Sequence, residues 1–220
     1  MKKSLSILLV LVLLLSTFAL TACASPRATD TVYIAIKDYG IITAELYGND
    51  APITVDNFIS LAEAGFYDNL TFHRVIENFM IQGGDPKGNG TGGSEKNITG
   101  EFANNGIDTG IRHVRGTLSM ARSGSPLEQY ASIPDAYRPY LEQAYNSASS
   151  QFFIVHKTSE NNTLSLDGKY AAFGQVIEGI EIVDQITSVQ TDANDKPLKT
   201  VTILTITLDR EKAEAALAGS

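Results

Sequence analysis

The chain has 220 residues, 43% of them hydrophobic, which suits a single globular domain with a sizeable core. Its 25 acidic residues outnumber its 17 basic ones. Because such an acidic surface repels phosphate backbones, we expect no nucleic-acid partner. The chain contains a single cysteine, which excludes an internal disulfide.

The first 22 residues have the pattern of a secretion signal. Lys2 and Lys3 precede an apolar run, residues 5–15, that is too short to predict a membrane span. The letters LTAC at 20–23 then resemble the lipobox of bacterial lipoproteins, in which the cysteine becomes the lipidated first residue of the mature chain. The alternative is a plain signal peptide, in which Cys23 has no role.

The lipobox resemblance implies a domain order and a location. We expect residues 1–22 to be a lipoprotein signal peptide and residues 23–30 to be a tether that carries lipid at Cys23. The protein would then lie in the cell envelope, anchored on the extracytoplasmic face of a bacterial membrane.

Residues 31–210 are expected to form one mainly β domain. Alternating apolar residues and a glycine turn predict a hairpin over 31–47, and apolar spacing at i, i+3, i+4 and i+7 predicts a helix over 51–66. Later strands are expected over 115–121, 151–156, 170–176 and 199–208, with a second helix over 177–189. The tail, 211–220, has a helix-forming composition, but a frayed end is an equal alternative.

This order of elements favours a sheet closed on itself. Many short strands with only two helices are typical of a β-barrel whose open ends the helices cover. We therefore expect a closed, antiparallel β-barrel capped by two α-helices.

The stretch TFHRVIENFMIQGGD, residues 71–85, predicts a second hairpin. A two-residue loop would place Arg74 opposite Ile81, and a three-residue loop, 77–79, would place it opposite Gln82. The second register is better, because it separates Arg74, Met80 and Gln82 from the core residues on the other face. The Gln82 amide oxygen could then orient the Arg74 guanidinium. A surface arginine lying on its own hydrocarbon stem is the alternative interpretation.

Four spaced motifs, FHRVIENFMIQGGD, RGTLSMAR, SQFFIV and LDGKYAAFGQVIEGIEIVD, together resemble the cyclophilin family of peptidyl-prolyl cis-trans isomerases over residues 31–208. The resemblance implies an eight-stranded barrel, proline-containing unfolded or extended polypeptides as partners, no cofactor and no metal. We expect the protein to assist the folding of exported proteins, as a monomer.

The family's site residues correspond to positions of this chain. The resemblance places the catalytic arginine at Arg74 and its polar neighbour at Gln82. The remaining substrate-binding positions are Phe79, Met80, Ala121, Gln151, Phe153, Leu166 and Tyr170. A fixed cation beside an apolar floor suits rotation about an amide bond, which needs no nucleophile.

Two positions and one inserted segment depart from the family pattern. Ser165 stands where many members carry tryptophan, and Tyr170 stands where histidine is frequent, so high affinity for cyclosporin is in doubt while the reaction is not. Residues 123–149 form an insert in place of a short loop, with Tyr137, Leu141 and Tyr145 at helical spacing. The insert is either a surface excursion packed on itself or an added wall beside the groove.

Other signals are weaker. GNGTGG at 88–93 has dinucleotide-binding spacing but leads into no helix, and the three histidines have no metal-ligand spacing. We expect His73 to be a core histidine with its hydrogen bonds satisfied. The alternative function is a non-catalytic proline-binding module or holdase chaperone at the membrane.

Overall fold

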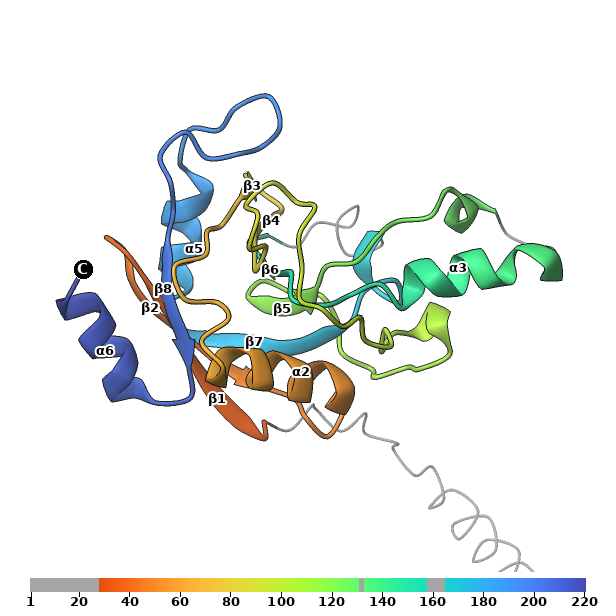
Figure 1. Cartoon of the computed structure of the whole chain (residues 1–220), viewed down its shortest axis with the longest axis horizontal. Coiled ribbons are helices and arrows are strands. Elements are labelled where there is room, and N and C mark those ends of the chain that lie inside the picture. Colours follow the sequence, from red (N-terminus) through yellow and green to blue (C-terminus); the bar gives the residue numbers. More distant parts are fainter. Residues whose placement is uncertain (1–27, 131–132, 158–164) are drawn as a thin grey trace, which may run out of the picture.

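The structure, a computed structural model, describes residues 28–130, 133–157 and 165–220 (Figure 1). The expected signal peptide, Cys23 and most of the tether lie outside these residues. Among the described helices, none has the length and apolar character to cross a membrane.

Eight antiparallel strands form one sheet in the order β3-β4-β6-β5-β7-β2-β1-β8. They are β1 (Asp30–Ile36), β2 (Gly40–Leu46), β3 (Arg74–Ile76), β4 (Met80–Gly83), β5 (Thr117–Met120), β6 (Phe152–Val155), β7 (Ala172–Glu178) and β8 (Ile203–Thr207). The predicted mainly β domain with an antiparallel sheet and two core helices is confirmed.

The sheet is open, so the expected closed barrel is wrong. The two edge strands, β3 and β8, do not pair with each other, and only an isolated bridge between Thr71 and Thr202 joins the segments that precede them. The physical reason lies at β3, which is three residues long. Its Val75 amide donates to the carbonyl oxygen of Asp195 at 2.8 Å, so a loop takes the place that a closing strand would need.

Both helices expected in the domain are present, and two more α-helices lie wholly within the described residues. They are α2 (Pro52–Glu63), with proline in the first turn, and α5 (Ile180–Thr187). The insert contains α3 (Arg138–Tyr145), which projects away from the sheet (Figure 1). The tail forms α6 (Arg210–Ala218), which packs against β1 and β8 and begins at Asp209, whose carboxylate accepts two backbone amides. Short 3₁₀ turns cover Ala103–Asn105, Pro126–Gln129 and Asp135–Tyr137.

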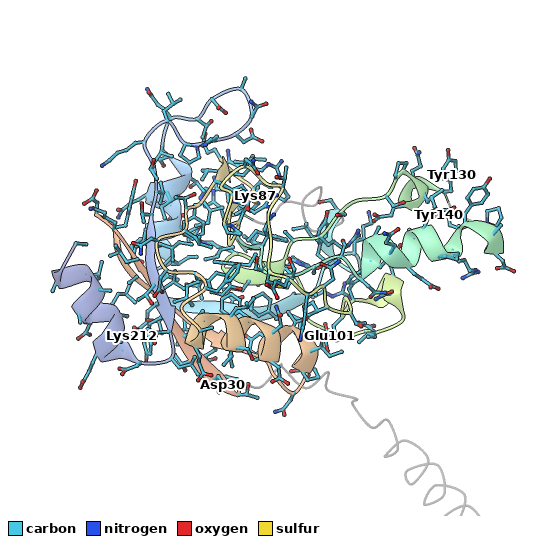
Figure 2. All side chains as sticks on the ribbon, in the orientation of Figure 1. Asp30, Lys87, Glu101, Tyr130, Tyr140 and Lys212 are labelled. Carbon is cyan, nitrogen blue, oxygen red and sulfur yellow. The ribbon has the colours of Figure 1, made fainter. Side chains whose placement is uncertain are left out.

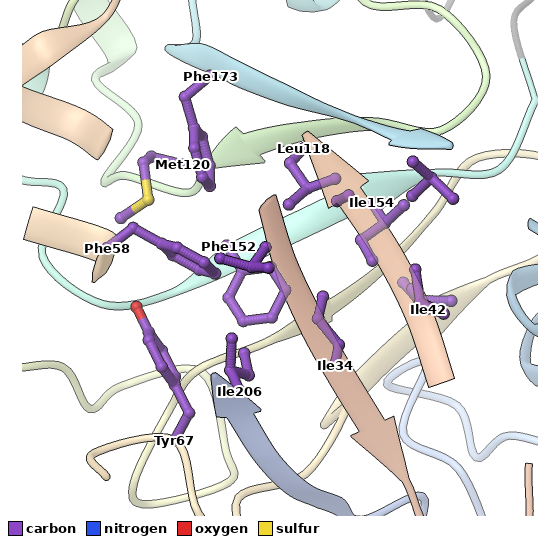
Figure 3. Close-up of a cluster of buried hydrophobic side chains, with 14 of the residues drawn as sticks. Ile34, Ile42, Phe58, Tyr67, Leu118, Met120, Phe152, Ile154, Phe173 and Ile206 are labelled. Atoms are coloured by element: carbon purple, nitrogen blue, oxygen red, sulfur yellow. The ribbon is translucent and has the colours of Figure 1, made fainter. Parts of the chain in front are cut away.

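An aromatic cluster joins α2 to the sheet (Figure 3). Phe58 of α2 lies with its ring centroid 5.4 Å from that of Phe152 on β6, 5.0 Å from Phe173 on β7 and 5.2 Å from Tyr67. All four side chains are fully buried. Buried aromatic side chains are among the largest contributors to the stability of a protein core. This packing of α2 therefore holds the sheet firmly in place.

Candidate functional site

The hairpin of β3 and β4 has the register expected from its three-residue loop. Arg74 pairs with Gln82, Val75 with Ile81, and Ile76 with Met80. Val75 and Ile81 are buried in the main core, whereas Arg74 and Gln82 are half-buried on the opposite face. Because side chains alternate along a strand, the guanidinium of Arg74 and the amide of Gln82 lie together on the face of the sheet that points away from the main core.

A different residue from the one expected holds Arg74. Its Nε donates to Oδ2 of Asp195 at 3.3 Å, and the two side chains are 43% and 42% exposed. The expected hydrogen bond from Arg74 to Gln82 is not formed within the described part of the chain. Asp195 lies 121 residues further along, so no local spacing could have indicated it.

Gln82 instead begins a chain of amide hydrogen bonds. Its Nε2 donates to Oε1 of Gln151 at 2.9 Å, and Nε2 of Gln151 donates to the carbonyl oxygens of Gly90 at 3.1 Å and Gly92 at 2.7 Å. The glycine-rich loop is thereby tied to the strand that carries Gln82. Asp85 orders the same loop, because its carboxylate accepts the backbone amide of Gly90 and two others nearby.

An apolar pocket opens next to Arg74. A small cluster separate from the main core lines it, with Met80, Phe153 and Leu166 buried at its base. The pocket has a volume of about 180 Å³, and its walls are Arg74, Phe79, Met80, Gln82, Ala121, Arg122, Phe153, Leu166 and Tyr170. The size and the apolar base suit one small ring, with Arg74 in the wall beside it.

A buried polar network fixes the pocket wall from behind. The imidazole of His113 stacks on Phe153, and its Nδ1 and Nε2 lie 2.9 Å from Oδ1 of Asp167 and 2.9 Å from Oγ of Ser119. Burial lowers the pKa of His113, although Asp167 opposes this shift. Burial alone would raise the pKa of Asp167, but its contacts with His113 and the hydrogen bond from Arg112 together outweigh it, and the net shift is downward. Asp167 follows Leu166 directly, so the network locks that side of the pocket.

Arg122 links the pocket to the insert. Its guanidinium carbon lies 5.1 Å from the ring centroid of Phe102, 5.0 Å from Tyr145 and 4.8 Å from Tyr170, and its side chain is 2% exposed. Its terminal nitrogens also form a two-bond ion pair with Glu128 at 3.0 and 2.7 Å, which lowers the pKa of that carboxyl group. Glu128 and Tyr145 belong to the insert, whereas Tyr170 is a wall of the pocket.

A second, polar hollow of about 440 Å³ adjoins the apolar pocket. The two share Gln82, Ala121 and Arg122, and the larger one is bordered by the glycine-rich loop and by both ends of the insert. Of the two alternatives left open for the insert, an added wall beside the groove agrees with the position of its two ends, where Ser123, Ser147 and Ser149 line this hollow. Its outer tip, where Tyr130 and Tyr140 are exposed, lies away from the sheet (Figure 2).

His73 is buried as expected, at 5% exposure, but its hydrogen bonds are not satisfied. Neither ring nitrogen has a hydrogen-bond partner within the described residues. Burial lowers its pKa, an effect that Asp85 opposes, so the ring is neutral at pH 7.

The structure brings the predicted site residues together. Eight of the nine border the apolar pocket, and Gln151 lies on the neighbouring polar hollow. Sequence reasoning missed Asp195, His113, Asp167 and the joining role of Arg122, because each acts through partners distant in the chain. The described residues contain no group of three or more side chains suited to hold a metal ion. The arrangement can grip a small apolar ring and present hydrogen-bond donors to its edge.

Comparison with known proteins identifies one family. The model of the cyclophilin type peptidyl-prolyl cis-trans isomerase family matches residues 31–208. A peptidyl-prolyl cis-trans isomerase-like 1 of Neurospora crassa is 40% identical over 79% of this chain and 91% of its own. The isomerase cypE of Dictyostelium discoideum is 41% identical over 76% of this chain and 91% of its own. A crystal structure of a Cryptosporidium parvum cyclophilin, described as determined in the presence of the dipeptide Ala-Pro, superposes with a TM-score of 0.65 at 29% identity, covering 82% of this chain and 99% of that one.

Proposed function

Because this chain belongs to the cyclophilin-type peptidyl-prolyl cis-trans isomerase family, we propose that its apolar pocket binds the proline ring of an extended polypeptide while Arg74 catalyses rotation about the preceding peptide bond. The single observation that carries this assignment is the place of Arg74 in the wall of a pocket of about 180 Å³ with an apolar base. The substrates are proline-containing unfolded chains, and the protein assists their folding as a monomer.

The chemistry follows from the amide bond. Rotation about an X-Pro bond crosses a barrier of about 20 kcal/mol, because resonance is lost at the twisted midpoint and the proline nitrogen becomes pyramidal. An N–H donor directed at that nitrogen stabilises the twisted form more than either planar form, which is the condition for catalysis. Phe153, Met80 and Leu166 hold the ring in place while the flanking chain turns.

Gln82 and Gln151 suit a second task, which is to bind the backbone of the substrate. Their amides are already fixed by the bonds to Gly90 and Gly92, so binding costs little additional ordering. Ala121 at the shared border of the two hollows lets the chain pass from one to the other.

A protease-coupled isomerisation assay on the domain from residue 31 onward tests the proposal. Wild-type protein should accelerate cis-to-trans conversion of a proline tetrapeptide, and Arg74→Ala should lose at least about 90% of kcat/KM. The fold should persist, because replacing a half-exposed arginine costs about 0.5 kcal/mol or less. Binding of the peptide without turnover by the wild type would favour a non-catalytic proline-binding module, and unchanged turnover in Arg74→Ala would overturn the role of Arg74.

We also propose that Cys23 carries a lipid that anchors the domain to the extracytoplasmic face of a bacterial membrane. The support is the LTAC sequence after a basic and apolar leader. In bacteria that express the full chain, Cys23→Ser should move the protein from the membrane fraction to the soluble or secreted fraction. If the variant remains on membranes to the same extent, the cysteine is not the anchor.

A further inference from the structure

We propose that Asp195 is a positioning residue for Arg74, so that the guanidinium serves the apolar pocket instead of turning away from it. This inference rests on the proposed function of Arg74. Its basis is the hydrogen bond from Nε of Arg74 to Oδ2 of Asp195 at 3.3 Å, which leaves both terminal nitrogens without a protein partner among the described residues.

Arg74 has space to move in two directions. It borders the apolar pocket on one side and, on the other, a hollow of about 520 Å³ whose further lining residues include His73, Asn89 and three residues of the turn that carries Asp195, namely Asp192, Asn194 and Lys196. A long side chain that is 43% exposed would sample both sides unless something held it. The hydrogen bond at Nε restricts the Arg74 side chain to one orientation. It uses the Nε–H donor and leaves both terminal nitrogens available to the substrate.

The turn that carries Asp195 is held independently of Arg74. Oδ1 of Asp192 accepts the backbone amides of Asn194 at 2.8 Å and Lys196 at 3.0 Å. The carbonyl oxygen of Asp195 accepts the amide of Val75, the residue after Arg74, at 2.8 Å. The carboxylate is therefore fixed to the same strand that presents the cation.

The backbone of the turn tolerates an aspartate at this position but does not require one. Asp195 has a φ of +64°, in the left-handed region that glycine adopts at the lowest cost and that aspartate also adopts. A glycine here would suit the turn at least as well, so replacing Asp195 by glycine removes the contact with Arg74 without straining the turn.

This contrast separates a positioning role from a structural one. Asp195→Gly should leave the unfolding midpoint unchanged or raise it, while kcat/KM falls by about two- to fivefold, or about 0.4–1 kcal/mol at tenfold per 1.4 kcal/mol. The loss should appear mainly in kcat, because Arg74 acts on the twisted bond whereas the pocket that sets KM is untouched. Asp195→Asn should restore part of the activity, since its amide oxygen still accepts the Nε hydrogen.

Asp38→Gly is a matched control. Asp38 also has a left-handed φ, +68°, and forms an exposed ion pair, with Lys199 at 3.5 Å, but it lies in the turn between β1 and β2. Its replacement should not change kcat. An Asp195→Gly variant with unchanged or higher kcat/KM would overturn the inference even if Arg74→Ala is inactive, whereas an active Arg74→Ala variant would overturn the proposed function itself.

Discussion

The backbone amide of Thr54, in the first turn of α2, donates to Oε2 of Glu101 at 2.8 Å, and the Thr54 hydroxyl donates to the same oxygen at 2.6 Å. The other oxygen, Oε1, accepts the amide of Ile53 at 3.1 Å. Glu101 is 2% exposed and caps a helix that has no cap of its own, because Ala51 at the N-cap position offers no side-chain acceptor. A buried residue distant in sequence thus anchors the helix beneath the sheet.

Glu101→Gln should destabilise the domain by about 1–3 kcal/mol, because one acceptor becomes an amide nitrogen that faces other donors. The charge that favours a helix N-terminus is lost as well. Urea unfolding followed by circular dichroism measures the change. Glu95→Gln, which alters an exposed carboxylate, is the control and should change the free energy of unfolding by about 0.5 kcal/mol or less. Equal midpoints for the two variants would refute the capping role.

The pair of Arg122 and Glu128 should tie the insert to the pocket. In Glu128→Gln the Arg122 cation stays buried among aromatic rings without a carboxylate, so we expect a loss of about 1–3 kcal/mol in stability. Arg122 also contacts Tyr170, so its movement in this variant should displace that wall of the pocket. KM should then rise by about two- to fivefold, with little change in kcat because Arg74 is not involved.

Asp135→Asn provides the matched comparison for that prediction. It removes an insert carboxylate of the same charge from an exposed ion pair with Arg138, whose net contribution is about 0–1 kcal/mol. Its KM should equal that of the wild type. A KM unchanged in both variants would show that the insert does not position the pocket.

Acidification should destabilise the domain from about pH 6.5 downward. His113 has a lowered pKa in the folded state, so below the unfolded value of 6.5 the unfolded chain binds more protons and stability falls as pH falls. Asp167, the charged group in contact with its ring, also has a lowered pKa and therefore stays ionised in this range. The slope is at most about 1.4 kcal/mol per pH unit for each such histidine. Unfolding curves between pH 7.5 and 5 should show a shallower slope for His113→Gln, and a steeper one would contradict the assignment.

Ser165→Trp should raise affinity for cyclosporin far more than it raises turnover. Ser165 is exposed and directly precedes Leu166 of the pocket, where the family's tryptophan would add a flat apolar face and an indole donor. About 80 Å² of added apolar contact is worth roughly 2 kcal/mol, and a hydrogen bond adds roughly 1 kcal/mol. The combined gain corresponds to about a hundredfold in the dissociation constant. Titration calorimetry that finds equal affinity for the two proteins would reject this explanation.

The sequence by itself determined the features that depend on neighbours along the chain. Alternation and loop length predicted the hairpin in which Arg74 opposes Gln82, and helical spacing with Pro52 predicted α2. The hairpin and the helix are predictable because each signal lies within a single strand, turn or helix. The pocket residues, such as Phe79 and Leu166, were instead indicated by the resemblance of the ordered motifs to the cyclophilin family, and the fold brings them to one pocket.

Only the tertiary structure decided which distant groups meet. The bond from Arg74 to Asp195, the cap that Glu101 places on α2 and the opening of the sheet beside β3 all join segments separated by long stretches of chain. Their geometry depends on the paths of loops, which no local periodicity encodes. The sequence therefore indicated which side chains form the pocket, whereas the packing of remote loops determined how the cation at its rim is held.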